Sequence, residues 1–422
     1  MTQQEIASTF ALFNKIQYVG TAPNRAVALE RYQDNFELLK EWRVLYADNT
    51  KEGPFRLRRQ YFGQTGFVST VFRGRSIWII DSDVIANQGT LPFKIGMGTH
   101  LDTNSASYIR ALAYKPQPAP SLYNVCDALS DTFSIGEMSD FNPYLYLWEV
   151  QSNRSQHSIK RIRETISAIA AIKLIKAPLT IDWRQKYQEV YRLVAEKEAD
   201  IFLAKFYADI DLGHGDGIES LVDMMEIILL KTKIIEHSSN RSAQNKLEEL
   251  LIAMDSQMST FMFRELVICA DILFKSKKTQ LSEKINSLQN QKKPLALIRN
   301  CARDMSMIRM LDQMTNTYTD NNGSSFYIGN LITFDKDVRD IIEITELNAI
   351  ALHQNSSATF PIYNTEIQNW LSKQLGEKRL ERLSFLFSFK AFASRAKNRS
   401  HSSIKEQLIE DRAQLLSLLV IK

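Results

Sequence analysis

The chain has 422 residues with 52 basic and 48 acidic side chains, so its formal net charge is only +4. This length exceeds what one hydrophobic core usually fills, and more than one structural unit is expected. Three widely spaced cysteines argue against a disulfide framework and against a zinc–thiolate site. The chain does not open with a basic segment followed by an apolar run, and it has no apolar segment long enough to cross a bilayer. We therefore expect a cytoplasmic protein without a membrane span.

The first part of the chain is expected to change from helices to strands. Apolar residues at helical spacing predict helices across residues 1–50, with Trp42 as the last member of one series. Residues 55–85 are rich in aromatic and β-branched side chains separated by glycines, which indicates two or three strands. The glycines of the run 95–100 make it a poor strand, whereas residues 105–113 have a helical pattern.

The rest of the chain is predicted to be mostly helical. One helix is expected to begin at Asn142 as its N-cap, with Pro143 at its first position. Residues 159–288 have helical periodicity almost throughout, which predicts a large helical module. A short apolar strand is expected at 326–334, and helices should follow to the C-terminus with an interruption at 356–361.

Four acidic residues stand where a buried carboxylate needs a partner, namely Asp102, Glu149, Asp304 and Asp335. An unpaired carboxylate costs several kcal/mol to bury. Asp335 ends the apolar strand and precedes a helix, and Asp102 stands at a similar junction, so both are expected at the carboxyl edge of a sheet. Asp304 shares the apolar stripe of its helix, and Glu149 follows a largely apolar helix face.

Carboxylates that converge on one pocket can hold a divalent cation. Mg²⁺ and Mn²⁺ are hard ions that bind carboxylate and water oxygens, and a few carboxylates plus waters suffice. One or two such ions can activate a water and clamp a phosphate for in-line displacement. The four acids therefore predict hydrolysis of a phosphodiester, with Mg²⁺ or Mn²⁺ as the cofactor.

The order of these motifs resembles that of the PIN-domain nucleases. The resemblance lies in Leu-Asp-Thr-Asn at 101–104, in Glu149 near the start of a helix, in Ala-Arg-Asp-Met-Ser-Met-Ile-Arg at 302–309 and in Leu-Ile-Thr-Phe-Asp-Lys-Asp at 331–337. It implies a three-layer α/β/α domain in which the four acids are the catalytic metal ligands and Asn104 supports the first of them. Members of that family mostly cut RNA, so the resemblance implies an endoribonuclease.

The resemblance covers residues 95–150 and 295–345, and the gap between Glu149 and Asp304 is far longer than a minimal PIN domain needs. A large helical insertion is therefore assumed. We predict an α/β protein in five parts: N-terminal helices and a small β region (1–94), the first part of the PIN-like domain (95–150), the helical insertion (151–294), the second part of the PIN-like domain (295–345) and a basic helical C-terminal region (346–422).

Another strand could supply the first acid. Residues 77–83, Ile-Trp-Ile-Ile-Asp-Ser-Asp, have a better strand pattern than the run before Asp102. Asp81 or Asp83 could then replace Asp102, or could mark a phosphohydrolase of another fold. That alternative predicts Asp81 and Asp83 in the pocket and Asp102 outside it.

Each acid also has a purely structural interpretation. Asp-Thr-Asn is a good capping sequence without any chemistry, and Asp335 could cap the helix that follows it. Asp304 could form an ion pair with an arginine of its own helix, such as Arg299, Arg303 or Arg309. In that case the α/β core is a scaffold, and the protein is a catalytically inactive interaction protein that recruits partners through its helical module.

Basic residues interleaved with aromatic residues indicate where a nucleic acid could bind. They are Arg56, Arg58 and Arg59 on a predicted strand and Arg395, Lys397 and Arg399 in the C-terminal region. Such faces contact phosphates and stack bases, but a solvated sheet face or an amphipathic helix that docks on a protein or membrane surface has the same pattern. Together with these faces, the resemblance to PIN-domain nucleases implies a metal-dependent endoribonuclease with RNA as its partner. With the large appended module, the resemblance also implies a toxin or defence role.

Overall fold

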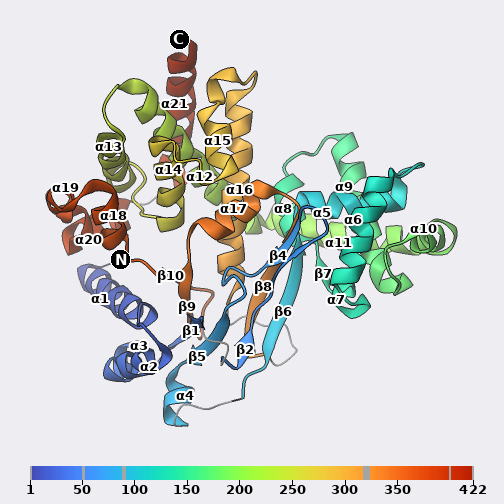
Figure 1. Ribbon diagram of the computed structural model, residues 1–422, viewed down its shortest axis with the longest axis horizontal. Helices are drawn as coiled ribbons and strands as arrows, with labels where there is room; N and C mark the ends of the chain where they lie inside the picture. Colours follow the sequence, from blue (N-terminus) through green and yellow to red (C-terminus); the bar gives the residue numbers. More distant parts are fainter. Residues whose placement is uncertain (1, 50–52, 88–91, 317–323, 399–400, 421–422) are drawn as a thin grey trace.

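The computed structural model describes residues 2–49, 53–87, 92–316, 324–398 and 401–420. Within these residues, ten strands form two five-stranded sheets with helices around them (Figure 1). The mixed α/β class predicted from the sequence is confirmed. A search of the same residues finds no helix that is both long and apolar enough to cross a membrane.

The first sheet is antiparallel and joins strands from both ends of the chain in the order β10–β9–β1–β5–β2. Its strands are β1 (Trp42–Asp48), β2 (Phe55–Arg56), β5 (Ser76–Ile80), β9 (Leu347–His353) and β10 (Thr359–Tyr363). Helices α1 (Gln3–Gly20), α2 (Arg25–Asp34) and α3 (Phe36–Leu39) share a hydrophobic cluster with β1, and α4 (Ser82–Ala86) follows β5.

Two predictions fail in this sheet. Trp42, which continues a helical series in the sequence, begins β1. The region 346–422 is not wholly helical, because β9 and β10 form a hairpin in it before α18 (Ile367–Leu375), α19 (Glu377–Arg382), α20 (Phe389–Asn398) and α21 (His401–Val420). The pairing of β1 with β9 joins segments about 300 residues apart, and local residue spacing does not reveal such a partner.

The second sheet has the order β3–β4–β8–β6–β7 and contains a parallel core. Strand β8 (Phe326–Thr333) lies beside β6 (Ile95–Leu101), which lies beside β7 (Phe141–Asn142), and these three run parallel. Strands β3 (Arg59–Phe62) and β4 (Gly66–Ser69) extend the sheet in the antiparallel sense. Residues 55–85 thus supply four strands, rather than two or three, and divide them between the two sheets.

The expectation that residues 95–100 form a poor strand is wrong, because they lie within β6. Its glycines are required by the neighbouring strand. A Cβ atom added at Gly98 would lie 1.8 Å from the hydroxyl oxygen of Tyr327, which crosses over it from β8. The residues that weaken the strand pattern are therefore the ones that admit the partner strand closely.

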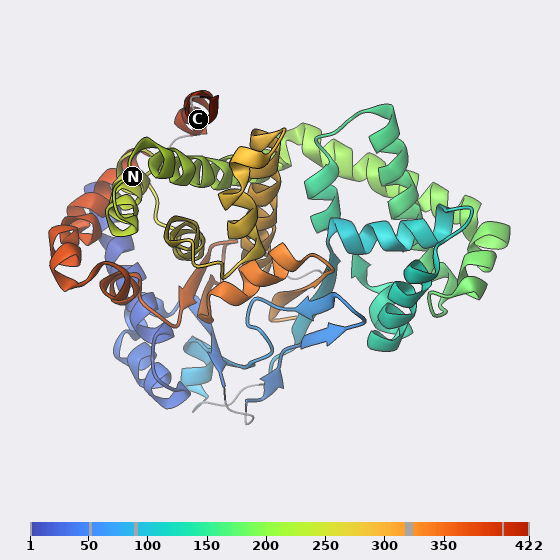
Figure 2. The same ribbon diagram turned by 45° about the horizontal axis from the view of Figure 1, so that its top comes forward.

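The helices between residues 156 and 290 fall into two groups that Figure 2 separates. One group comprises α9 (Gln156–Ile175), α10 (Ile181–Lys186) and α11 (Arg192–Asp209), and it shares a core with α5 (Thr103–Tyr114), α6 (Pro120–Thr132), α7 (Ile135–Ser139) and α8 (Tyr144–Val150). The other comprises α12 (Asp216–Ser238), α13 (Ala243–Ser256), α14 (Phe263–Phe274) and α15 (Gln280–Asn286), and it packs with α16 (Pro294–Met314), α17 (Lys336–Ile344) and α21.

Candidate functional site

The four predicted acids line a single pocket at one edge of the second sheet. Asp102 directly follows β6, and Asp335 lies two residues beyond the end of β8. These strands are parallel with Leu101 opposite Ile332, so their carboxyl ends lie side by side. Glu149 comes from α8, which follows β7 and contacts β6, and Asp304 comes from α16, which packs on β8. Ligands of open α/β sheets commonly bind at this edge.

The pocket has a volume of about 310 Å³. It is lined by Asp102, Thr103, Asn104, Glu149, Lys284, Leu297, Asn300, Cys301, Asp304, Met307, Asp335, Asp337 and Val338. These residues come from helices and strand ends that are far apart in the sequence. They include every acid predicted from the sequence and a fifth, Asp337.

Asp102 is buried and holds three hydrogen bonds. Its Oδ1 accepts from the backbone nitrogen and the hydroxyl of Ser105, both at 2.6 Å, and its Oδ2 accepts from the Thr333 hydroxyl at 2.5 Å. Burial raises the pKa of this carboxyl above its usual range, although these hydrogen bonds oppose the shift. Asp102 is thus the N-cap of α5, as the structural interpretation expected, and it also faces the pocket.

Asp335 is likewise a helix cap with one oxygen directed at a pocket residue. Its Oδ1 accepts from the backbone nitrogen of Asp337 at 2.8 Å, at the start of α17. The Asn104 amide donates to its Oδ2 at 3.5 Å. Asn104 was predicted to support Asp102, but its side chain is exposed and donates instead to Asp335, across the edge from β6 to β8.

Glu149 lies close to the other carboxylates. Its Oε2 accepts a hydrogen bond from the Thr103 hydroxyl. Burial raises the pKa of Glu149 to about 7, and the negative charges of Asp102 and Asp335 add to that shift. The positive charge of Arg303 opposes this shift without cancelling it.

Asp304 is the least compensated of the four acids. Within the described residues its carboxylate has neither a hydrogen bond nor an ion pair. Burial raises its pKa well above the usual range, and Asp335 and Glu149 raise it further. Two of the arginines that could pair with it point elsewhere, since Arg299 binds Glu219, Asp223 and Glu226, and Arg309 binds Glu265.

Sequence reasoning missed two charged members of the pocket, Asp337 and Lys284. Asp337 is almost fully buried, and its Oδ2 pairs with the Lys284 ammonium while its Oδ1 has no partner in the described part of the protein. Among the pocket-lining residues that the structure describes, Lys284 is the only basic one. Asp337 is the last residue of the motif at 331–337 and could have been found there. Lys284 gives no such signal, because it comes from α15.

The donor set fits a hard cation in kind, because it offers carboxylate oxygens and no imidazole. In the residues described, however, no three His, Cys, Asp or Glu side chains are placed so that they could hold an ion by themselves. Mg²⁺ does not require such a cage, since it keeps several waters and commonly binds one or two carboxylates together with substrate phosphates. The pocket therefore suits a hydrated ion better than a closed structural site.

The alternative first acids lie elsewhere. Asp81 follows β5 in the first sheet, where its buried carboxylate pairs with Arg43 at 2.7 Å and caps α4. Neither Asp81 nor Asp83 lines the pocket, whereas Asp102 does. The structure thus contradicts the alternative that places Asp81 and Asp83 in the site and Asp102 outside it.

None of the predicted nucleic-acid-binding residues that the structure describes lines the pocket, and three of the six form ion pairs. Arg58 bonds Glu137 at 2.8 Å, Arg59 bonds Glu343, and Arg395 bonds Asp255. Arg56 and Lys397 are exposed, and Arg399 lies outside the described residues. Three of these six basic residues therefore connect elements within the protein.

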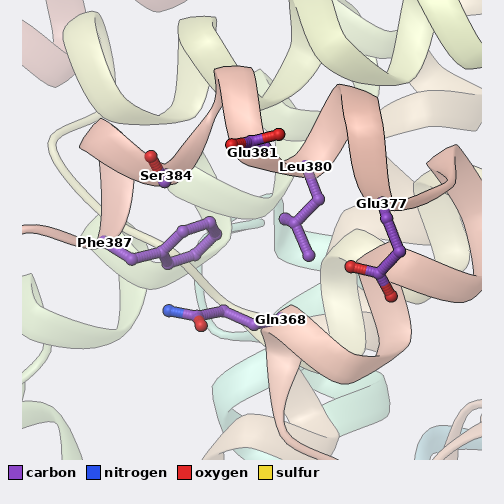
Figure 3. Close-up of a pocket in the computed structure, with 6 residues that line it drawn as sticks. All are labelled: Gln368, Glu377, Leu380, Glu381, Ser384 and Phe387. Atoms are coloured by element: carbon purple, nitrogen blue, oxygen red, sulfur yellow. The ribbon is translucent and has the colours of Figure 1, made fainter.

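The C-terminal helices enclose a second cavity of about 300 Å³ (Figure 3). It is lined by Gln368, Glu377, Leu380, Glu381, Ser384 and Phe387. Glu377 already accepts a hydrogen bond from Ser372. The cavity offers no concentration of uncompensated charge like that of the acidic pocket.

Comparison with known proteins finds no family model, no curated protein and no solved structure that matches this chain. The resemblance to PIN-domain nucleases consequently depends on the motif residues alone and stays a prediction.

Proposed function

We propose that the acidic pocket binds Mg²⁺ or Mn²⁺ and that the protein is a metal-dependent endonuclease acting on RNA. The observation that supports this most is the meeting of five carboxylates from four separate segments in one pocket with a single lysine. If all are ionised, these side chains carry a net charge of 1 − 5 = −4. Such a concentration of like charge is costly unless a cation compensates it.

Each residue has a distinct part in this proposal. Asp304 and Asp335 are the main ligands, because Asp304 has no hydrogen bond or ion pair among the residues that the structure describes and Asp335 keeps one oxygen nearly free. Glu149 adds a further carboxylate to the pocket. Asp102 accepts a hydrogen bond from Thr333, which holds the end of β6 beside the end of β8 and so fixes the positions of the acids at this edge. Lys284 lies where it can contact a substrate phosphate. When bound, a divalent ion supplies Lewis acidity and lowers the pKa of a water molecule.

The PIN-like architecture belongs to this proposal. Supporting it are the three adjacent parallel strands β7–β6–β8 and the acids at their carboxyl edge. RNA as the substrate is supported by the motif resemblance. The competing function, a scaffold without catalysis, is favoured by one observation: Asp102 and Asp335 each cap a helix, which gives them a structural reason to be acidic.

The test combines cleavage with direct metal binding. Purified protein is incubated with labelled RNA and DNA in Mn²⁺, Mg²⁺ or EDTA, and metal binding is followed separately by calorimetry. Asp304→Asn should abolish both metal binding and cleavage. Asp83→Asn, which alters an exposed acid outside the pocket, is the matched control and should change neither.

The outcomes separate the two functions. Metal-dependent cleavage of RNA that is lost in EDTA and in Asp304→Asn supports the nuclease. Metal binding without cleavage of either nucleic acid supports a metal site but contradicts the nuclease. A folded wild-type protein that binds no metal at millimolar concentration leaves the scaffold as the better description.

A further inference from the structure

Helix α11 and the helical turns at its two ends carry apolar side chains on a surface that should be polar. Seventeen large apolar side chains of the described residues are exposed, and six of them lie between residues 181 and 212. They are Ile181, Val190, Leu193, Val194, Ile201 and Leu212, with Leu193 81% and Leu212 75% exposed. These residues belong to α10, η1 (Tyr187–Tyr191), α11 and η2 (Ile210–His214), which form one nearly continuous helical rod.

The opposite face of α11 is already used for packing. Ala195, Ala199, Leu203 and Phe206 are buried in the core shared with α9. A surface helix normally has an apolar stripe toward the core and polar residues on its outer face. Because α11 is apolar on both faces, its outer stripe has the character of a contact surface.

The spacing of the outer stripe indicates what kind of surface fits it. Of the six exposed apolar residues, Val190, Val194 and Ile201 lie on one stripe, which comprises positions 190, 194, 197, 201, 204 and 208 at intervals of four and three residues. Five of these positions are Val, Ile or Ala, and the sixth is Lys197. This is the 3.5-residue repeat of helices that pair side by side along their length. The stripe from 190 to 208 spans about 27 Å at 1.5 Å per residue. A second helix is therefore the expected partner.

The charges beside the stripe favour a second copy of the same helix in the opposite direction. Glu198 and Lys205 are both exposed, are one heptad apart and lie on the same side of the stripe. When two identical helices pair antiparallel, the same side of each faces its counterpart. Glu198 of each copy then meets Lys205 of the other. In a parallel pair Lys205 would meet Asp200, whose carboxylate is already held by Arg163 at 2.6 Å.

We propose that this protein forms a two-fold symmetric dimer through antiparallel pairing of α11. The contact is self-complementary in charge, as a closed two-fold dimer requires. Because a single helix from each copy forms the contact, we expect a weak dimer with a dissociation constant in the micromolar range. This proposal does not depend on the proposed nuclease activity.

Sedimentation velocity of the full chain between about 1 and 100 µM tests the proposal. The wild type should pass from monomer to dimer over this range. Ile201→Asp places a charge in the middle of the seam and should weaken the dimer at least 100-fold. Ile409→Asp changes an equally exposed apolar residue on α21 and should leave association unchanged. A wild type that stays monomeric, or a dimer that Ile201→Asp leaves intact, overturns the proposal.

A pair of charge reversals tests the antiparallel arrangement. Glu198→Lys and Lys205→Glu should each weaken the dimer about tenfold, because each places like charges opposite one another. The double variant restores opposite charges and should recover most of the wild-type affinity. Both positions are exposed, so the variants should fold normally, which circular dichroism can verify. If the double variant is weaker than either single variant, the helices do not pair in this orientation.

Discussion

Replacing Asp304 by asparagine should stabilise the protein without metal and destabilise it when metal is present. The carboxylate of Asp304 has no hydrogen bond or ion pair in the described residues, and Asp335 and Glu149 repel it. Two unit charges about 7 Å apart repel by about 2 kcal/mol at an effective dielectric constant of about 20. Because these neighbours are partly neutralised by protons and hydrogen bonds, we expect a net gain of about 1–2 kcal/mol for Asp304→Asn in EDTA at pH 8.

A bound metal ion should make the wild type more stable than Asp304→Asn. At 100 times its dissociation constant, a ligand stabilises the folded state by about 2.7 kcal/mol, and only the wild type should receive this in full. With an unfolding entropy of about 2.1 cal/mol/K per residue, 422 residues give about 0.9 kcal/mol/K. The variant should thus melt about 1–2 °C higher than the wild type in EDTA, and the wild type should rise by about 3 °C with Mn²⁺ or Mg²⁺.

The pH dependence gives this prediction a second check. Since the pKa of Asp304 is raised on folding, its ionisation penalises the folded state fully above that raised pKa, and the penalty vanishes below the ordinary pKa. The advantage of Asp304→Asn in EDTA should therefore disappear as the pH falls through this window. Thermal melts at several pH values provide the measurement. A variant that is less stable than the wild type in EDTA, or that gains as much from metal, would refute the reasoning.

Three other substitutions follow from the same pocket. Asp102→Ala removes the N-cap of α5 and leaves its hydrogen-bond donors unsatisfied, so urea unfolding should show a loss of about 2–3 kcal/mol; a loss below about 0.5 kcal/mol would contradict the capping role. Lys284→Met keeps a long unbranched side chain but leaves the buried Asp337 without its cation, so it should destabilise the metal-free protein by about 3 kcal/mol. An unchanged stability would show that this ion pair does not stabilise the fold. Glu149 has a folded-state pKa of about 7 against an ordinary 4.5, so metal-free stability should fall by about 3 kcal/mol between pH 4.5 and 7, at about 1.4 kcal/mol per pKa unit. Glu149→Gln should flatten that slope, and an unchanged slope would assign it to other groups.

The acids of the pocket could be predicted because each one interrupts an apolar pattern. Asp102 and Asp335 follow apolar strand residues, and Asp304 lies on the apolar side of its helix. Each position therefore indicates a buried carboxylate independently of the other two. Their meeting in space is a consequence of parallel strand pairing between β6 and β8, which no local pattern specifies. The motif order supplied that information.

The remaining features could not be predicted because they depend on distant partners. Strands β1, β9 and β10 are strands because they pair with one another, although their sequences allow helices. Lys284 reaches Asp337 from a helix 53 residues earlier in the chain. The helical region between residues 156 and 290 has one clear break in its periodicity, at the glycines of residues 213–217, and the two groups divide there. Which helices each group packs against is visible only in the structure.

The parallel pairing of β6 with β8 also orders the steps by which the protein is made. Asp102 and Asp335 are separated by 335 − 102 = 233 residues. A ribosome adds roughly 5–20 residues per second, so it needs about 12–47 s to extend the chain from Asp102 to Asp335. During that time the only parallel neighbour of β6 is the two-residue strand β7, and the pocket still lacks Asp335 and Asp337. A chain released before residue 335 therefore lacks a complete pocket, and any function of that pocket begins only after most of the protein has been synthesised.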